Sequence, residues 1–410
     1  MKIAIIGGGA AGVIAAITAK RLNKKLHVDI FDINKAIGKK ILASGNGRCN
    51  ISNTKITQEN YFGENPSFIN QALKEFDFKA FENFCKSIGL ILDIKDSCKV
   101  YPLSNEAKSV VTLLENELDR LEINQILQTK IVDIQKLDEK FNLISVENKE
   151  FNGYDRVLIS SGLQAAPQLN STEDGIDIAT KFNHTFNPTY PSLVGLHTQF
   201  DYKNKLQGVK KEATVTLYID KQKDKQITGD VLFTKYGVSG FAILDISQYA
   251  VYPLSLYQDV TISINLFPTL TRNELLGILQ TLFKTLAKSD AVEALTGIIP
   301  IKLAVVLLQM NNIDINAKAD SINAKQQRAI INTLTNLRLK IEDTQGFKHA
   351  EASGGGIRTD EVDNKTYESK LCKNLFFAGE VLDIVGNRGG FNLHFAWASG
   401  FLAGKNLAKL

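Results

Sequence analysis

Three glycines and one aspartate near the start of the chain have the spacing of a dinucleotide-binding site. Gly7, Gly9 and Gly12 follow the apolar run 3–6, and Asp32 lies 20 residues beyond the last of them. The first glycine permits a tight turn, the second lets the backbone approach a pyrophosphate, and the third lets a helix pack closely on a strand. A carboxylate at this distance can accept hydrogen bonds from a ribose diol and would repel a 2′-phosphate. The pattern predicts a site for a dinucleotide with an unphosphorylated adenosine ribose.

The elements that must hold these residues are a strand, a helix and a second strand. Residues 3–6 are an apolar run of buried-strand length, residues 10–22 have helical spacing, and residues 26–31 are a second predicted strand. Ala10 and Ala11 open the helix, where free N–H groups and the helix dipole attract phosphates. A glycine-rich turn of another α/β protein is the alternative. Strand, helix and spaced acid occur together here, which favours dinucleotide binding.

A second glycine-rich segment, residues 38–50, reads GKKILASGNGRCN. An NAD dehydrogenase would have another strand–helix repeat here, whereas this segment can lie along a flat polar ligand. Its cations can offset phosphate charge or polarise a ring carbonyl, and a solvated basic loop is the alternative. Cys49 has no cysteine close to it in sequence, which favours a small buried residue over a redox thiol. We predict cofactor contacts from Lys39, Lys40, Ser44, Gly45, Asn46, Gly47, Arg48 and Asn50.

The next segment with strand-like runs replaces a crossover helix. Residues 131–134, 141–146 and 156–159 are predicted strands of a three-strand meander, separated by charged or glycine-containing turns. The backbone of Val132 is a candidate for contacting an adenine. The last of these strands leads to Gly162 and directs its carboxyl end toward the same crevice as the first glycine-rich turn.

The middle of the chain changes character near residue 188. Short β-like runs continue to residue 268, and residues 269–345 have helical patterns that begin with the capping-box sequence Thr271-Arg272-Asn273-Glu274. No second G-x-G-x-x-G follows a strand in this region, so no separate NAD(P)H domain is predicted. We interpret it as an insert that covers the reactive end of the cofactor.

The last sixty residues return to the first domain. Residues 374–378 form a predicted strand, which runs into GEVLD, and GNRGGFN then opens a closing helix. Glu380 or Asp383 can bind a ribityl chain, and the amides of residues 390–392 can face an isoalloxazine. The positive helix end would stabilise the negative charge of a reduced flavin. The predicted cofactor contacts in this segment are Gly379, Glu380, Asp383, Gly389, Gly390, Phe391 and Asn392.

The chain has 410 residues, a formal net charge of +4 and 44% apolar residues, as expected of a globular protein with a large core. The charge is not gathered into a basic run, so no nucleic-acid partner is predicted. The four cysteines lack metal-ligand spacing, so no metal site is predicted. No signal peptide precedes the first strand, and the most apolar stretch is too short to cross a bilayer. We therefore expect a cytoplasmic protein without a membrane partner.

Five motifs, in order along the whole chain, resemble the YhiN/BaiN-type FAD-dependent oxidoreductases, also called the aminoacetone-oxidase family. They are GGGAAG, GKKILASGNGRCN, LFTKYGVSG, ASGGG and FAGEVLDIVGNRGGFNLHFAWASG. The resemblance implies an α/β fold, in which a Rossmann-like two-dinucleotide-binding FAD domain (1–187 and 346–410) is interrupted by an inserted β-rich domain (188–268) and a helical subdomain (269–345). It carries FAD binding onto Gly7, Gly9, Gly12, Asp32, Lys39, Lys40, Gly45, Arg48, Asn50, Gly379, Glu380, Asp383, Gly389, Gly390, Phe391 and Asn392.

The predicted function is hydride exchange between non-covalently bound FAD and a small organic substrate. An amine oxidase and a reductase fed by transient NAD(P)H both fit the single cofactor motif. The candidates for the reactive face are Arg48, Asn50, Arg388 and His394, and His394 also fits a structural role. A flavin-dependent tRNA-modifying enzyme and a non-catalytic flavin-binding redox sensor are the alternatives from other classes.

Overall fold

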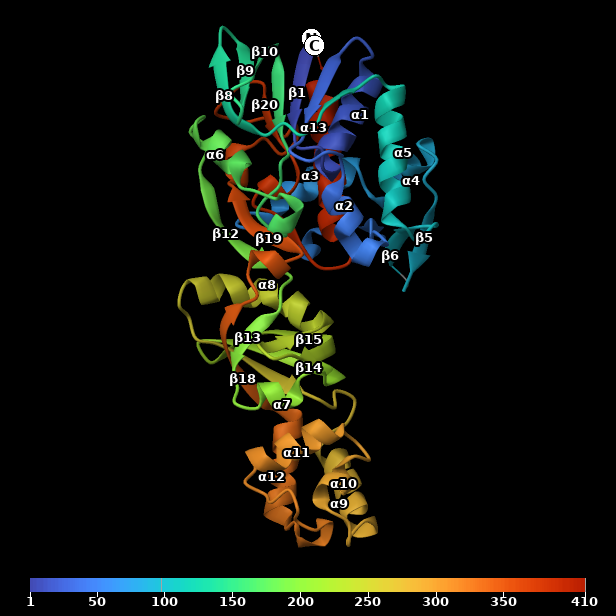
Figure 1. Ribbon diagram of the computed structural model, residues 1–410, viewed down its shortest axis with the longest axis vertical. Coiled ribbons are helices and arrows are strands. Elements are labelled where there is room, and N and C mark those ends of the chain that lie inside the picture. The colour runs from blue at the N-terminus through green and yellow to red at the C-terminus, as the bar shows by residue number, and fades with distance from the viewer. Residues whose placement is uncertain (97, 410) are drawn as a thin grey trace. The chain divides into compact units, whose positions relative to one another are not determined.

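Five parallel strands form the central sheet of the first of two units. The computed structural model describes residues 1–96 and 98–409, and the chain divides into Met1–Tyr190 with Glu351–Leu410, and Pro191–Ala350. The strand order is β20-β11-β1-β2-β7 (Figure 1). The strands are β1 (Lys2–Ile6), β2 (His27–Phe31), β7 (Asn124–Ile126), β11 (Arg156–Ile159) and β20 (Leu375–Phe377), all paired in parallel. The sequence-predicted strand–helix–strand start of the chain is confirmed.

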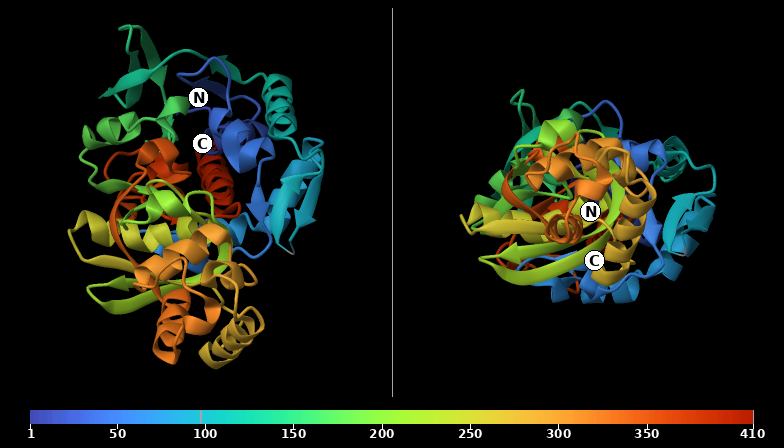
Figure 2. Two further views of the ribbon diagram at one scale, coloured as in Figure 1. Left: turned by 60° about the horizontal axis from the view of Figure 1, so that its bottom comes forward. Right: turned by 90° about the horizontal axis from the view of Figure 1, so that it is seen from below.

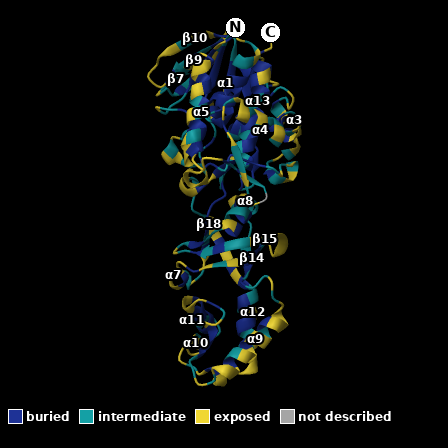
Figure 3. Cartoon of the chain, turned by 90° about the vertical axis from the view of Figure 1, so that its right-hand side faces the viewer, coloured by how far each residue is buried: buried dark blue, intermediate teal, exposed yellow. Residues whose placement is uncertain are grey.

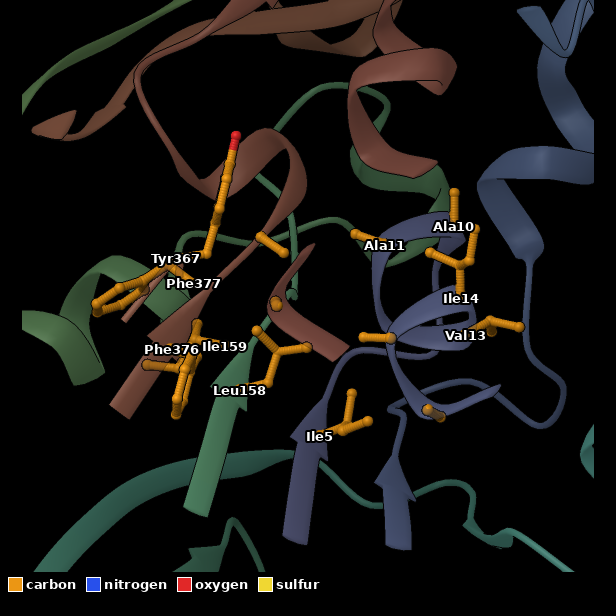
Figure 4. Close-up of a cluster of buried hydrophobic side chains, with 14 of the residues drawn as sticks. Ile5, Ala10, Ala11, Val13, Ile14, Leu158, Ile159, Tyr367, Phe376 and Phe377 are labelled. Carbon is orange, nitrogen blue, oxygen red and sulfur yellow. The ribbon is translucent and has the colours of Figure 1, made fainter. Parts of the chain in front are cut away.

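Two helices pack against each other beside this sheet. α1 (Ala10–Leu22) buries every residue from Ala10 to Ala19, as the dark blue of Figure 3 shows. α13 (Phe391–Leu407) lies along it, and Gly400 makes the close approach possible. A Cβ at Gly400 would lie 2.2 Å from the carbonyl oxygen of Ala11. Figure 4 shows apolar side chains from α1, β1, β11 and β20 meeting in this core.

Smaller sheets and helices complete the first unit. The sheets are β8 (Ile131–Leu137), β9 (Lys140–Ser145) and β10 (Glu150–Tyr154); β3 (Ser52–Asn53), β6 (Lys99–Pro102) and β5 (Leu92–Lys95); β21 (Val385–Gly386) with β4 (Tyr61–Phe62); and β12 (Phe186–Ser192) with β19 (Ala352–Ile357). The helices are α2 (Lys39–Ala43), α3 (Asn70–Glu75), α4 (Phe78–Ser87), α5 (Ala107–Arg120) and α6 (Asp174–Thr180).

The prediction of the three-strand meander was wrong for its third strand. Residues 150–154 form β10 and complete the antiparallel meander, whereas residues 156–159 form β11 in the parallel sheet. β10 is hard to recognise because its pairing with β9 shifts register before Tyr154, where Gly153 has a φ of 80°. β11 has the continuous apolar run of a strand buried on both faces, which is typical of parallel sheets.

The second unit contains a closed six-stranded barrel. Its order is β13-β16-β15-β14-β17-β18, and its strands can be followed in yellow-green and orange in Figure 2. The strands are β13 (Leu196–Gln199), β14 (Lys210–Ile219), β15 (Gln222–Phe233), β16 (Gly237–Ser239), β17 (Val260–Asn265) and β18 (Leu337–Thr344). α7 (Lys203–Leu206) and α8 (Phe241–Ser255) connect strands of the barrel.

Four helices are inserted between the last two barrel strands. They are α9 (Arg272–Thr285), α10 (Ala291–Leu295), α11 (Ile301–Met310) and α12 (Ala324–Thr335). The predicted capping box at the start of α9 is confirmed, because the Thr271 side chain accepts from Glu274 N–H. β18 lies within the range predicted to be helical, and its alternation of buried Leu337, Leu339 and Ile341 with exposed residues is the strand signal that the prediction missed.

Within the described part of the chain, no helix combines the length and the apolar character that a membrane crossing requires.

Candidate functional site

The glycine-rich turn after β1 is tight on two sides and open on the third. Gly7 has a φ of 105°, and a Cβ there would lie 2.5 Å from the carbonyl oxygen of Ser160. A Cβ at Gly12 would lie 2.0 Å from the carbonyl oxygen of Gly7. At Gly9, by contrast, a Cβ would meet no described atom within 4 Å. The turn therefore packs closely against β11 and leaves the start of α1 accessible to a ligand.

Asp32 is held beside this turn by backbone groups. Its Oδ2 accepts the Gly8 N–H at 2.8 Å, and its Oδ1 accepts the Asn34 N–H at 2.7 Å. The Gly38 N–H donates to the carbonyl oxygen of Gly8 at 2.8 Å, which brings the start of the 38–50 segment to the same turn. These bonds fix the orientation of the carboxylate while each oxygen keeps accepting capacity.

Lys39 and Lys40 bind to different parts of the site. Lys39 Nζ donates to Asn34 Oδ1 at 3.1 Å, next to the Asp32 turn. Lys40 Nζ forms an ion pair with Glu380 Oε2 at 2.6 Å, and Glu380 Oε1 accepts the Ser353 N–H at 3.0 Å. The Lys40–Glu380 pair joins residues 340 positions apart in the sequence.

Two further predicted glycines lie around this pair. A Cβ at Gly162, which has a φ of 76°, would lie 3.4 Å from Glu380 Oε2. A Cβ at Gly379 would lie 2.9 Å from the Cβ of Ala11, in the first turn of α1. The predicted residues that follow β1, β2, β11 and β20 therefore gather at the carboxyl edge of the sheet, where open α/β sheets bind ligands.

The loop around Gly45, Asn46 and Gly47 runs in the left-handed region, with φ values of 57°, 54° and 81°. Arg48 follows it with an exposed side chain, whose guanidinium lies 5.7 Å from the centre of the Tyr101 ring. Ser44 Oγ donates to the carbonyl oxygen of Ile41 at 2.7 Å. The structure thus shows Arg48 at the surface, where its Nε donates to the carbonyl oxygen of Gly45 at 3.4 Å.

Cys49 is completely buried, and burial raises its thiol pKa to about 11. At neutral pH the side chain is therefore protonated and a poor nucleophile. This favours the interpretation of Cys49 as a packing residue.

Val132 lies in a β-bulge. Its neighbours Ile131 and Asp133 pair with Ser145 and Ile144, so one extra residue is accommodated in β8. The extra residue of a bulge is left out of the ladder. Its backbone groups are therefore suited to the contact with an adenine that the sequence predicted.

The turn before α13 is built around two glycines and one amide. Gly389 and Gly390 have φ values of 123° and 96°. Asn392 Oδ1 accepts the Gly386 N–H at 2.7 Å, and its Nδ2 donates to the Gly386 carbonyl oxygen at 2.8 Å. The Phe391 carbonyl oxygen accepts from Tyr61 Oη at 3.1 Å. The Asn392 side chain therefore holds its own loop, and the backbone amides of the turn remain the groups that can face a ligand.

Asp383 is buried and has protein partners of its own. Its Oδ2 accepts from the Glu64 N–H at 2.9 Å and from Asn187 Nδ2 at 2.7 Å. Burial raises the pKa of this carboxyl group above its ordinary value. The predicted ribityl contact therefore rests on a carboxylate that already joins three segments of the first unit.

His394 is fully buried, whereas Arg388 is half-buried. The His394 ring lies between Ser52 Oγ, at 2.9 Å, and the carbonyl oxygen of Phe76, at 3.1 Å. Burial lowers its pKa to about 4, so the ring is neutral at physiological pH. The Asn50 amide nitrogen, in the orientation that satisfies its surroundings, donates to the carbonyl oxygens of Val100 and Ser52.

Several residues that shape the site carried no signal in the sequence. Asn34, Ser52, Asn53 and Asn187 are polar residues outside the motifs. Asn34 accepts from Lys39, five positions away, whereas the partners of the other three lie more than 190 positions away. Asn53 Nδ2, for example, donates to the carbonyl oxygen of Gly389 at 3.0 Å. Within the described residues, no group of three or more His, Cys, Asp or Glu side chains could hold a metal ion.

This geometry fits a dinucleotide. Only glycines are compatible with the close contacts at positions 7, 12 and 390, and the open side of Gly9 exposes the helix start to a pyrophosphate. The Asp32 carboxylate is held beside the same turn and keeps the accepting capacity that a ribose diol requires. A second helix start, at Phe391, lies beyond the left-handed Gly390 and supplies further N–H groups.

Comparisons with known proteins agree with this reading. The family model described as "HI0933-like protein Rossmann domain" matches residues 1–406. The 3-dehydro-bile acid delta(4,6)-reductase of Clostridium scindens is 35% identical over 408 residues, covering 100% of this chain and 99% of that protein. The ribosomal RNA dihydrouridine synthase of Escherichia coli is 29% identical over 406 residues, covering 98% and 97%.

A solved structure supports the fold. The 3-ketosteroid delta1-dehydrogenase of Sterolibacterium denitrificans aligns with a TM-score of 0.51 at 11% identity, over 99% of each chain. From the family match over nearly the whole chain, and from the full-length relative at 35% identity, it follows that the chain belongs to the HI0933-like Rossmann family and is an FAD-dependent oxidoreductase.

Proposed function

We propose that this protein reduces a carbon–carbon double bond that is conjugated to a carbonyl group. The supporting observation is that two full-length relatives are named for substrates of very different size, a 3-dehydro bile acid and ribosomal RNA. Both names describe the same chemistry. A 3-oxo group is conjugated with a neighbouring double bond in the first substrate, and the double bond of uracil that becomes saturated in dihydrouridine is conjugated with a ring carbonyl.

The reaction requires three groups to be positioned. The β-carbon of the substrate receives a hydride, the α-carbon receives a proton, and the carbonyl oxygen carries the negative charge that develops between the two events. Bound FAD supplies the hydride-transfer chemistry. The chain's own residues must hold the cofactor, stabilise the developing charge and exclude competing water.

The site geometry supports the following proposed cofactor contacts. The amides at the start of α1, next to Gly9, would hold the pyrophosphate, and Asp32 the adenosine ribose. The bulge at Val132 would contact the adenine. The Lys40–Glu380 pair and Asp383 would lie along the ribityl chain, and the amides of residues 390–392 would face the isoalloxazine. Positive charge at that helix start favours the reduced, anionic form of a flavin.

We assign to Arg48 and Arg388 the stabilisation of the negative charge that develops on the substrate carbonyl oxygen. Arg48 is exposed, and its guanidinium can move toward a bound ligand. Asn50, which uses its amide nitrogen for the carbonyl oxygens of Ser52 and Val100, keeps its oxygen as an acceptor. Transient NAD(P)H is the proposed source of the two electrons, and the cytoplasm is the proposed location.

The first candidate substrate is a small cyclic enone, because the relative named for the bile acid has the higher identity. The second candidate is uridine within ribosomal RNA, on the strength of the E. coli relative. The proposed domain organisation assigns cofactor binding to residues 1–187 and 346–410, and treats 188–268 as an inserted β-rich domain and 269–345 as a helical subdomain.

The test is anaerobic re-oxidation of the reduced holoprotein. FAD is reduced photochemically, and the protein is mixed with a 3-oxo-4-ene steroid, its saturated analogue, or ribosomal RNA transcribed in vitro without modification. Return of the yellow oxidised absorbance with the enone alone supports the first candidate, and return with the RNA alone supports the second. If neither restores the colour while an amine reduces the oxidised protein, the proposal is wrong and an amine oxidase is the correct class.

A further inference from the structure

Three hydrogen bonds fasten residues 51–53, which include β3, to α13 and the turn before it. Ser52 Oγ lies 2.9 Å from His394 Nδ1, Trp397 Nε1 donates to the Ile51 carbonyl oxygen at 3.1 Å, and Asn53 Nδ2 donates to the Gly389 carbonyl oxygen at 3.0 Å. We call this set of contacts the β3–α13 latch. It connects segments more than 330 residues apart in the sequence.

The direction of the hydrogen bonds at His394 follows from its partners. A carbonyl oxygen can only accept, so the contact with Phe76 places the ring hydrogen on Nε2. Nδ1 is therefore the acceptor, and the Ser52 hydroxyl donates to it. Both ring nitrogens are used, and the ring is buried in an edge-to-face contact with the Phe81 ring. A neutral ring in one tautomer thus fixes one hydroxyl group.

The latch leaves little freedom for β3 to move. A Cβ at Gly390 would lie 2.2 Å from the carbonyl oxygen of Ser52, so the turn passes directly against that group. The amide nitrogen of Asn50 donates to the same carbonyl oxygen at 3.0 Å. Any displacement of Ser52 must therefore move the Gly389–Gly390 turn, the Asn50 side chain, or both.

We infer that His394 is a positioning residue: through Ser52 it sets the spacing between the Arg48–Asn50 segment and the first turn of α13. This inference rests on the proposed function, in which that turn faces the isoalloxazine and the segment lines the reactive face. His394 acts on these groups without touching the substrate. Loosening the β3–α13 latch would withdraw the amides of α13 from the isoalloxazine ring and weaken their stabilisation of reduced FAD.

The first test measures the midpoint potential of FAD in the holoprotein. His394→Phe keeps a ring of similar size and removes both polar contacts, and Ser52→Ala removes only the hydroxyl. At a fixed potential we expect the ratio of reduced to oxidised FAD to fall about tenfold in each, a shift of about 30 mV toward negative values for a two-electron couple. His394→Gln, which can both donate and accept, is expected to restore the wild-type potential.

The matched control is His184→Gln. His184 is also buried, with its ring nitrogens at 3.0 Å from Glu361 Oε2 and 2.7 Å from Ser369 Oγ, but those partners belong to neither β3 nor α13. This variant should lower the melting temperature and leave the potential unchanged. An equal shift in His184→Gln, or an unchanged potential in both His394→Phe and Ser52→Ala, would overturn the inference. If His394→Phe fails to fold, Ser52→Ala decides the question.

A second readout does not depend on FAD. Hydrogen exchange in the apoprotein should become faster at residues 50–53 and 389–391 in Ser52→Ala, with α5 unchanged as an internal reference. Unchanged exchange in both segments would show that the latch does not restrain them and would contradict the inference. The failure of the proposed function is recognised separately, because a wild-type protein that ignores both enone and RNA still yields a potential and an exchange pattern.

Discussion

Gly9 and Gly12, three residues apart, meet very different surroundings. A Cβ at Gly12 would lie 2.0 Å from a carbonyl oxygen, whereas at Gly9, which has a φ of −80°, it would meet no described atom within 4 Å. We expect Gly9→Ala to leave the melting temperature of the apoprotein nearly unchanged and to weaken FAD binding at least tenfold, because the methyl group occupies the side where the pyrophosphate approaches. Gly12→Ala should destabilise the fold itself.

Thermal melting of the apoproteins and fluorescence titration with FAD separate the two effects. Normal FAD affinity in Gly9→Ala would show that the pyrophosphate does not use this turn. A melting temperature for Gly12→Ala equal to that of the wild type would show that the close helix–strand contact is not needed for stability.

His394 also predicts a pH dependence of stability. Its pKa is about 4 in the folded protein, against 6.5 ordinarily, so only the unfolded chain takes up the proton between these values. Its contribution to the free energy of unfolding is complete above pH 6.5 and is lost as the pH falls toward 4, by about 3 kcal/mol in all. Urea unfolding of wild type and His394→Phe across this range should show the difference between them shrinking with acid. A constant difference would contradict the assignment.

At the scale of elements, the contact between α1 and α13 depends on glycines in α13. Gly400→Ala would place a Cβ 2.2 Å from the Ala11 carbonyl oxygen and push the helices apart. We expect a loss of about 2 kcal/mol or more of unfolding free energy and weaker FAD binding, since Ala11 lies in the first turn of α1. The comparison is Gly277→Ala in α9, where a Cβ meets no described atom within 4 Å.

Gly277→Ala should stabilise the protein by about 0.5–1 kcal/mol, because alanine has the higher helix propensity. Gly277 lies with Leu270, Ile278 and Leu282 on an open surface hollow of about 580 Å³ beside α9. Denaturant unfolding of both variants measures whether each substitution lowers or raises the free energy of unfolding. Equal changes in Gly400→Ala and Gly277→Ala would show that close packing is not what selects glycine at position 400.

The same scale shows what local patterns can predict. β1, α1, β2 and the start of α9 were predictable because apolar spacing, capping residues and glycines act within a few positions. β18 was missed although it alternates, because it follows four helices without a composition change. The third meander strand was misplaced because a bulge at Gly153 interrupts its pattern. Such strands are fixed by partners that lie elsewhere in the chain.

The site divides in a similar way. The glycine-rich turns and Asp32 could be proposed as cofactor contacts from the sequence, because a fixed spacing is typical of their chemistry. The pairing of Lys40 with Glu380, of Ser52 with His394 and of Asp383 with Asn187 was not, because each contact joins segments at least 190 residues apart. Local sequence carries no record of which distant polar groups will meet.

At the scale of the whole molecule, the predicted cofactor contacts all belong to the first unit. β12 and β19 pair with each other there, next to the points where the chain leaves and returns. We expect a variant in which residues 191–350 are replaced by a short glycine–serine linker to fold and to bind FAD, because that unit has its own core. Absorbance of the purified, desalted variant checks this. A colourless variant that does not bind added FAD would show that the second unit is required.

The discontinuity of the first unit has a consequence for synthesis on the ribosome. β20 completes the edge of β11, and α13 covers the apolar surface of α1. Neither contact can form before residues 375–407 have been synthesised. At about 5–20 residues per second, 410 residues take roughly 20–80 s to translate. Throughout most of that time the apolar surface of α1 and the bare edge of β11 lack these partners. FAD binding at the predicted residues 379–392 therefore has to follow the synthesis of β20 and the start of α13.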